Sequence, residues 1–260
     1  MKVIDCFIFY NELDMLKFRL NELNDIVDYF VIVECTKTFA NTDKELYFEN
    51  NKEQFSKYLD KIIHIIVKEN IPVSSDPWQR ETYQRNCIDD GIKKLNLNMD
   101  DIVIISDVDE IPDVNAVLNF KNNIFDDICS LEMDFYYYNI NCQFAEKWHQ
   151  PKILNYSTYV KYDNPNTILR LPPNRHVIKN GGWHLSYFGN IDFIKNKIKN
   201  FSHQELNNEY ILNDDRIKKQ IQNNDDLFGR SYLINFIDIK DNPYLPHKYE
   251  EFKDFLLKKS

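Results

Sequence analysis

Glycine is scarce in this chain, with only 5 among 260 residues. The sequence contains no GxGxxG and no GxxxxGK[ST] stretch, so the two common glycine-rich phosphate loops are excluded. Long hydrophobic runs are also missing, because no apolar stretch approaches the roughly 18 residues that cross a membrane. The opening "MKVIDCFIFYNE" has a short apolar part that Asp5 interrupts, and no small-residue cleavage site follows it. We therefore expect no signal peptide and a soluble protein.

Paired cysteines and net positive charge are lacking as well. The five cysteines are scattered and form no CxxC pair, which argues against a disulfide framework or a zinc site. This usage favours a reducing compartment, and we expect a cytoplasmic location. The formal net charge is −9, whereas a general nucleic-acid binder needs a basic face. A nucleic-acid partner is therefore not expected, but a phosphate-bearing small molecule remains possible through a few local arginines or a metal ion.

Hydrophobic residues make up 43% of the chain, enough for a sizeable core. Apolar runs typical of buried strands alternate with helical patterns, at 3–10, 29–34, 61–67 and 101–106. This alternation predicts an α/β fold with a mainly parallel central sheet and helices on both faces. Asn11 is expected to cap the first helix, and Asp76-Pro77 to begin a helix that runs to about Leu95.

The pattern changes in the second half of the chain, after about residue 125. The stretch "SLEMDFYYYNINCQF" is aromatic and β-prone, and short polar segments follow it. Helical patterns return at 192–201 and 214–221. We expect a loop-rich α+β half with a helical C-terminus. Since no Gly- or Ser-rich linker separates the halves, 1–125 and 126–260 are expected to form a single domain.

Acidic side chains stand directly after the fourth apolar run, in "IISDVDEIP" (104–112). In open α/β sheets, ligands bind beyond the carboxyl ends of the strands. If the strand geometry continues, Asp107 and Asp109 point to the same side and form a hard-oxygen site for Mg²⁺ or Mn²⁺. The alternative is a solvated acidic turn that caps a helix near Asp113. The apolar strand and the third acid, Glu110, favour the metal site.

Two arginines, Arg80 and Arg85, lie in the helix before these acids, within "WQRETYQRN". The planar guanidinium group of arginine suits a diphosphate. Ordinary surface pairing with Glu81 or Asp89 accounts for either arginine equally well. The sequence alone leaves both readings open.

Several segments together resemble the glycosyltransferase family 17 pattern, from residue 4 to about 250. In chain order they are "FYNELDMLKFRLNELNDIVDYFVIVECTKTF", "WQRETYQRN", "DVDEIP", "GGWHLSYFG" and "FSHQE". The resemblance implies a GT-A-type fold with a D-x-D metal motif. It also implies inverting transfer of a sugar, N-acetylglucosamine, from a UDP-sugar to a glycan hydroxyl. Animal members are anchored in the Golgi membrane, whereas no anchor is expected here, so the acceptor and the oligomeric state stay open.

The resemblance also implies roles for individual residues. Asp109 and His184 would bind Mn²⁺ or Mg²⁺, with His203 as the weaker alternative, and Asp107 would contact the ribose or reach the metal through water. The candidates for donor binding are Asn11, Glu12, Glu34, Arg80, Arg85 and Asp107. Helix capping remains the alternative for Asn11. A surface position at the strand end remains the alternative for Glu34.

Acceptor binding and the catalytic base have separate candidates. Trp183 and Trp148 are expected to contact acceptor sugars, and the aromatic run 135–138 to line the same cleft. Inversion requires a carboxylate that takes the proton of the acceptor hydroxyl. Glu205, in "FSHQE", is favoured over Glu110, because the strand pleat turns Glu110 to the other side of the chain.

Two other classes of function stay open from the sequence. A nucleotidyltransferase or a metal-dependent phosphohydrolase also holds diphosphates through Mg²⁺ and acids. A non-catalytic glycan-binding protein on a degenerate transferase fold is the second class, against which the presence of Asp107, Asp109 and His184 argues.

Overall fold

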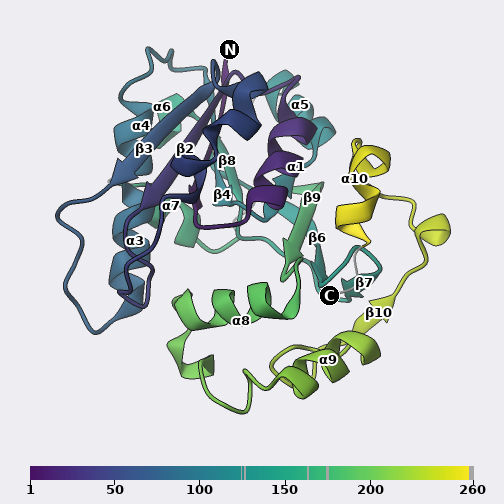
Figure 1. Ribbon diagram of the computed structural model, residues 1–260. Helices are drawn as coiled ribbons and strands as arrows, with labels where there is room; N and C mark the ends of the chain where they lie inside the picture. Colours follow the sequence, from purple (N-terminus) through teal and green to yellow (C-terminus); the bar gives the residue numbers. More distant parts are fainter. Residues whose placement is uncertain (124, 126, 163, 174–175, 258–260) are drawn as a thin grey trace.

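The computed structural model describes residues 1–123, 125, 127–162, 164–173 and 176–257. Within these ranges, ten strands form one sheet whose main path has the order β10-β7-β6-β8-β4-β1-β2-β3. The strands β5 and β9 pair with each other, and β9 also pairs with β6. Figure 1 shows the sheet with helices packed against it, and with α8 and α9 lying beyond the ends of β6 and β9.

The strands are β1 (Val3–Phe9), β2 (Tyr29–Cys35), β3 (Ile62–Val67), β4 (Ile102–Asp107), β5 (Glu110–Pro112), β6 (Cys129–Tyr137), β7 (Cys142–Phe144), β8 (Lys152–Asn155), β9 (Val177–Ser186) and β10 (Ile234–Phe236). The helices are α1 (Leu13–Leu23), α2 (Tyr47–Asn50), α3 (Pro77–Asn86), α4 (Ile88–Ile92), α5 (Val114–Asn122), α6 (Tyr156–Tyr159), α7 (Pro165–Arg170), α8 (Ile191–Asn200), α9 (Asp214–Asn223) and α10 (Tyr249–Leu256). Short 3₁₀ segments are η1 (Lys52–Tyr58), η2 (Gln204–Leu206) and η3 (Ile239–Asp241).

The four strands of the first half pair in parallel, as their alternation with helices predicted. Their side chains alternate between two cores. In β1, for example, Val3 and Phe7 pack with α1, α5 and α10, whereas Ile4 and Cys6 pack with α4 and α7. Helices therefore cover both faces, which explains why these strands are apolar at nearly every position.

The second half extends the same sheet with strands of both directions. Strand β8 is antiparallel to β4, and both β7 and β8 are antiparallel to β6. The sheet is therefore mixed: β6 and β9 pair in parallel, as β1 to β4 do, whereas the remaining pairings are antiparallel. The expectation of a mainly parallel sheet is confirmed for the first half only. The cause is connectivity, because β6 and β7 are joined by a short turn rather than by a crossover helix.

Two predictions about helix ends have different outcomes. Asp76 accepts a hydrogen bond from the backbone N–H of Trp78, with Pro77 at the first helical position, so this predicted cap is confirmed. The predicted single helix is divided at Cys87 into α3 and α4. The cap expected at Asn11 is wrong, because Glu12 occupies the N-cap position of α1.

The pairing of β5 with β9 brings two distant motifs together. Its register sets Glu110 opposite His184, Ile111 opposite Trp183 and Pro112 opposite Gly182. Gly182 has φ +139°, and a Cβ atom there would lie 2.0 Å from the carbonyl oxygen of Ile111. Only glycine fits this close approach of two backbones. Among the described helices, none is long and apolar enough to span a membrane.

Candidate active site

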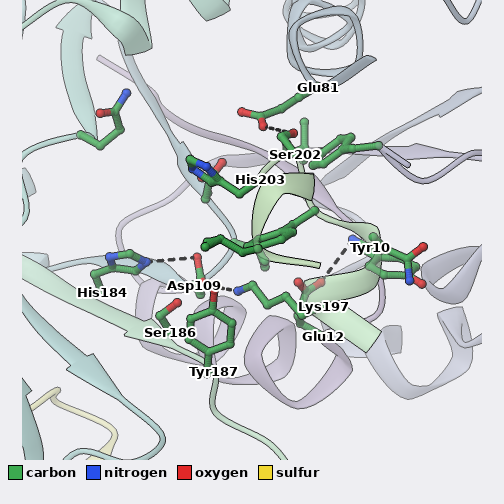
Figure 2. Close-up of a pocket in the computed structure, with 18 of the residues that line it drawn as sticks. Tyr10, Glu12, Glu81, Asp109, His184, Ser186, Tyr187, Lys197, Ser202 and His203 are labelled. Atoms are coloured by element: carbon green, nitrogen blue, oxygen red, sulfur yellow. Dashed lines mark hydrogen bonds and ion pairs between the residues drawn. The ribbon is translucent and has the colours of Figure 1, made fainter. Parts of the chain in front are cut away.

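A cavity of about 760 Å³ lies at the carboxyl ends of β1, β2 and β4. Both halves of the chain contribute to its wall, with Tyr10, Arg85 and Asp109 from the first and Trp148, His184 and Lys197 from the second. Figure 2 shows several of these side chains converging from different elements. The position agrees with the rule that ligands of α/β sheets bind beyond the strand ends.

The acidic turn at the cavity floor is held from beneath by Arg19 of α1. This side chain is fully buried and forms an ion pair of 2.6 Å with Asp5. It also donates to the backbone carbonyl oxygens of Asp107 and Glu110, each at 2.8 Å. Buried charge is tolerated when it is paired and hydrogen-bonded, as it is here. The sequence analysis did not single out Arg19, although its position on the leucine-spaced face of α1 is a readable signal.

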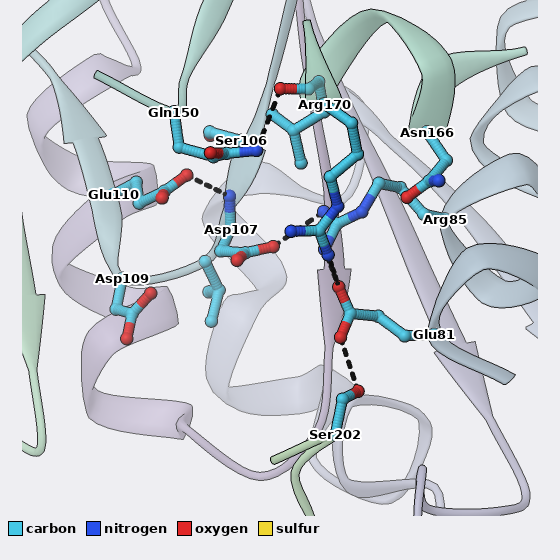
Figure 3. A network of polar contacts seen from close by, with 12 residues as sticks. Glu81, Arg85, Ser106, Asp107, Asp109, Glu110, Gln150, Asn166, Arg170 and Ser202 are labelled. Carbon is cyan, nitrogen blue, oxygen red and sulfur yellow. Dashed lines mark hydrogen bonds and ion pairs between the residues drawn. The ribbon is translucent and has the colours of Figure 1, made fainter. Parts of the chain in front are cut away.

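The carboxylate of Asp107 faces Arg85. Its Oδ1 lies 2.7 Å from Nη1 of Arg85, and Nη2 of the same guanidinium lies 2.9 Å from Glu81. Burial by itself would lower the pKa of Arg85, but the charges of Asp107 and Glu81 more than offset it and raise the pKa. Glu81 also accepts hydrogen bonds from Ser202 and Arg170 (Figure 3). Arg85 therefore lies on the cavity wall and fixes the orientation of Asp107.

The carboxylate of Asp109 faces different partners. Its Oδ2 lies 2.6 Å from Nζ of Lys197, and its Oδ1 lies 3.8 Å from Nε2 of His184 (Figure 2). Burial alone would raise the pKa of Asp109, but the charge of Lys197 and the hydrogen bond from it hold that pKa below its usual value. Strand β4 ends at Asp107, so the strand geometry on which the shared direction of Asp107 and Asp109 was predicted does not continue. Both side chains line the cavity, but they contact different partners.

His184 is a neutral imidazole enclosed by aromatic rings. Phe135 stacks on it at 4.6 Å between ring centroids, and Trp148 packs at the same distance. Burial lowers the pKa of His184 to about 4. Its Nδ1 atom is buried without a hydrogen-bond partner among the described residues. The ring is thus held in one orientation with Nε2 toward Asp109.

The predicted metal ligands converge only in part. Within the part of the chain that the structure describes, no group of three or more His, Cys, Asp or Glu side chains is arranged to hold a metal ion. Asp109 and His184 do approach each other and supply a carboxylate oxygen and a neutral imidazole nitrogen, which suit Mn²⁺. Asp107 is paired with Arg85 instead. These residues fit a metal ion as a pair of ligands, with Lys197 in contact with one of them.

The two candidates for the base lie in contrasting environments. Glu110 is fully buried outside the cavity wall, and accepts hydrogen bonds from the backbone N–H of Asp107 and from Nε1 of Trp148. Burial and the charge of Asp107 raise its pKa to about 8. The role of a base does not fit this geometry. Glu205 lies on the cavity wall, and its Oε1 lies 2.7 Å from Nδ1 of His203, a hydrogen bond that lowers its pKa.

Three of the predicted donor-binding residues lie off the cavity wall. Glu34 is fully buried and accepts from the backbone N–H of Phe48 at 2.9 Å, so neither the donor role nor a surface position fits it. Arg80 donates to the carbonyl oxygen of Phe39 at 2.6 Å and braces that loop. Asn11 donates to Asn196 of α8 at 3.3 Å. By contrast, Glu12, Arg85 and Asp107 line the cavity, as expected.

Of the residues expected to contact the acceptor, some face the cavity and one faces the core, because successive strand residues point to opposite sides of the sheet. Trp183 is fully buried, stacks on Tyr244 at 4.6 Å and donates to its carbonyl oxygen, so stacking on a sugar does not fit. Its neighbour on β9, His184, faces the cavity because successive strand residues point to opposite sides. On β6, Phe135 and Tyr137 likewise line the cavity. Trp148 lines it as well, as expected.

None of the four lysines that line the cavity within the described residues was predicted from the sequence: Lys37, Lys44, Lys147 and Lys197. Lys197 looks like an ordinary solvated residue of an amphipathic helix. Lys44 stands in a polar loop, yet its Nζ is buried without a hydrogen-bond partner among the described residues and lies 4.9 Å above the ring of Tyr10. Burial lowers the pKa of Lys44. No local sequence signal distinguishes either lysine.

Family membership follows from residues 1–233, which match the model of glycosyltransferase family 17. The chain therefore belongs to this family. It is 33% identical to the β-1,4-mannosyl-glycoprotein 4-β-N-acetylglucosaminyltransferases of Rattus norvegicus and Homo sapiens over 125 residues, which are 46% of this chain. The matched segment spans only 23% and 24% of those two relatives.

Solved structures offer only a weak likeness. HddC from Yersinia pseudotuberculosis aligns with a TM-score of 0.41 and 10% identity, covering 70% of this chain and 90% of that one. The same protein complexed with GMP-PN aligns with a TM-score of 0.34 and 9% identity, covering 68% and 82%.

Proposed function

We propose that the chain is a metal-dependent, inverting glycosyltransferase with a GT-A-type fold. It would move a sugar, N-acetylglucosamine, from a UDP-sugar to a hydroxyl group of a glycan. The observation that carries this proposal is that the acids of the DVD motif meet cations from both halves of the chain in one cavity. Membership of family 17 and the printed activity of the relatives support the reaction type and the sugar.

Unpartnered polar atoms support a polar ligand in this cavity. Among the buried side-chain atoms without a hydrogen-bond partner in the described residues are Nζ of Lys44, Nε of Arg85 and Nδ1 of His184. All three residues line the cavity. Leaving such groups unpaired costs free energy, roughly 1–3 kcal/mol each. A nucleoside diphosphate carries the carbonyl and phosphate oxygens that Lys44 and Arg85 would bind.

A divalent ion would be held by Asp109 and His184, and the donor diphosphate would complete its coordination. When bound, the ion would neutralise the charge that develops on the leaving diphosphate. Arg85 would keep Asp107 oriented through their 2.7 Å ion pair. The aromatic ring of Phe135 holds His184 in place, so the ligand nitrogen needs little reorganisation.

Glu205 would act as the base on the opposite side of the sugar. The acceptor hydroxyl oxygen bonds to the anomeric carbon, the bond from that carbon to the diphosphate oxygen breaks, and the hydroxyl proton moves to Glu205. Nδ1 of His203 donates to the Glu205 carboxylate at 2.7 Å and so holds it. Trp148 and Tyr232, on the wall of the second half, offer faces for the acceptor sugars.

The test is a transfer assay with a set of UDP-sugars, including UDP-N-acetylglucosamine, in Mn²⁺ and in EDTA. Released UDP and the mass of glycan acceptors are measured together. We expect an acceptor mass gain of one sugar that requires Mn²⁺. Faster hydrolysis of a nucleoside triphosphate than sugar transfer would indicate a phosphohydrolase or nucleotidyltransferase. Glycan binding without turnover of any donor would indicate a binding protein.

A further inference from the structure

Lys197 occupies one oxygen of the carboxylate that is proposed to bind the metal ion. Its Nζ lies 2.6 Å from Oδ2 of Asp109, and the two side chains are 21% and 8% exposed. This 2.6 Å separation is that of a charge-assisted hydrogen bond between an ammonium and a carboxylate. A protein cation and a divalent ion therefore compete for the same small, desolvated carboxylate.

The position of Lys197 follows from the docking of α8 on the first half of the chain. Asn196 contacts Asn11 after β1 at 3.3 Å, and Asn200 accepts from Thr42 at 3.0 Å. The Lys197 ammonium also lies 5.3 Å from the ring centroid of Tyr187. The backbone of Lys197 is thus fixed by the docking of α8, whereas its flexible four-carbon side chain can turn the ammonium group within the cavity.

We propose that Lys197 is an exchangeable cation of the donor site. Without a donor it neutralises Asp109, and when a nucleoside diphosphate and a divalent ion bind, its ammonium moves to the diphosphate and leaves Asp109 to the ion. This inference rests on the proposed function. Two cations a few ångströms apart repel each other in a buried site, so the ion binds weakly until the diphosphate supplies negative charge for both. Metal and donor binding are then coupled, and the coupling is reciprocal.

The inference predicts opposite effects of removing Lys197 on the two ligands. In the donor-free protein, Lys197→Met should bind Mn²⁺ at least about tenfold more tightly, because Asp109 has lost its internal partner. UDP should bind less tightly in EDTA, because one cation of the donor site is gone. The factor by which UDP strengthens Mn²⁺ binding should shrink, since it no longer includes release of Asp109 from Lys197.

The experiment titrates Mn²⁺ by electron paramagnetic resonance, with and without saturating UDP, and measures UDP affinity by calorimetry. The proteins are the unmodified chain, Lys197→Met, Lys197→Arg and Lys195→Met. Lys195 is the matched control on the same helix, where it pairs with Asp214 rather than with Asp109. Lys197→Arg keeps the charge and should retain weak Mn²⁺ binding in the absence of UDP.

Equal Mn²⁺ affinity in Lys197→Met and Lys195→Met would overturn the inference. If Lys197→Met melts before binding can be measured, Lys197→Gln is the second neutral variant. The unmodified chain alone also tests the inference. If UDP does not change its affinity for Mn²⁺, the exchange of Lys197 is excluded. Failure of the proposed function is distinct: the unmodified chain would then not bind UDP in Mn²⁺ at all. If the chain binds UDP but substitution of Lys197 does not change that binding, only the proposed exchange is wrong.

Discussion

The guanidinium of Arg19 donates a 2.8 Å hydrogen bond to the backbone carbonyl oxygen of Asp107, although 88 residues separate them in the chain. The same side chain bonds both oxygens of Asp5, at 2.6 and 2.8 Å. An ion pair within the core thus holds the turn that carries the acidic motif. The geometry of the cavity floor depends on α1 and β1 as much as on the motif itself.

Arg19→Met should destabilise the chain by about 3–5 kcal/mol, because Asp5 then keeps a buried charge without a partner. Urea unfolding followed by circular dichroism measures the loss. Lys17→Met is the matched control, because Lys17 is exposed on the same helix. A loss in Arg19→Met no larger than in Lys17→Met would show that the pair contributes nothing to the fold.

Asp109→Ala should remove the increase in UDP affinity that Mn²⁺ produces. Two acids in a chain of net charge −9 repel a free diphosphate, so UDP should bind poorly in EDTA and better with Mn²⁺. Asp107→Asn should lose less of this increase, because Asp107 pairs with Arg85. Calorimetry in both buffers measures the difference. UDP affinity that is the same in EDTA and Mn²⁺ would refute the metal proposal.

Arg85→Lys should weaken both the fold and donor binding. A lysine ammonium cannot reach Asp107 and Glu81 in the same two-pronged geometry. We expect a fall in the melting temperature together with a donor KM several-fold higher. Arg80→Lys is the comparison, because Arg80 is not itself on the cavity wall and donates to the backbone carbonyl oxygen of Phe39. It should lower stability with a smaller effect on donor KM. Normal donor kinetics in Arg85→Lys would assign this arginine to structure only.

Glu205→Gln should lower kcat by about 10²–10⁴, because glutamine keeps the shape and removes the basicity. Metal-dependent UDP binding should be intact, since Glu205 pairs with His203 and Asp109 pairs with Lys197. Steady-state kinetics and calorimetry on the same preparations separate the two effects. Near-normal turnover in Glu205→Gln beside an inactive Glu110→Gln that still binds UDP would transfer the role to Glu110.

Glu110 should make stability depend on pH in metal-free buffer. Burial, followed by the charge of Asp107, raises its pKa from 4.5 to about 8. Between these values the unfolded chain binds fewer protons than the folded chain, so this contribution is full below pH 4.5 and is lost as the pH rises through 8. Glu110→Gln should therefore flatten the fall in unfolding free energy from pH 5 to 8, by on the order of 1–4 kcal/mol. Parallel curves for the two proteins would show that Glu110 is ionised in the fold.

Local patterns predicted much of this chain. Apolar runs predicted β1 to β4 within a residue or two, because strands buried on both faces need apolar side chains at nearly every position. The resemblance in segments such as "DVDEIP" and "GGWHLSYFG" led to the family, which residues 1–233 confirm. The close backbone contact of Gly182 with Ile111 likewise explains a glycine pair that is visible in the sequence.

Only the tertiary structure decided which side chains face the cavity. Trp183 and His184 are neighbours in one motif, yet the pleat of β9 sends the first into the core and the second to the cavity. Lys197 belongs to a helix whose charges look solvated, and it reaches Asp109 because α8 docks across the strand ends. A sequence records the order of residues, whereas pairing between buried charges depends on which distant elements pack together. The strands were therefore predictable from local hydrophobicity, and the partners of Asp107, Asp109 and Glu110 were not.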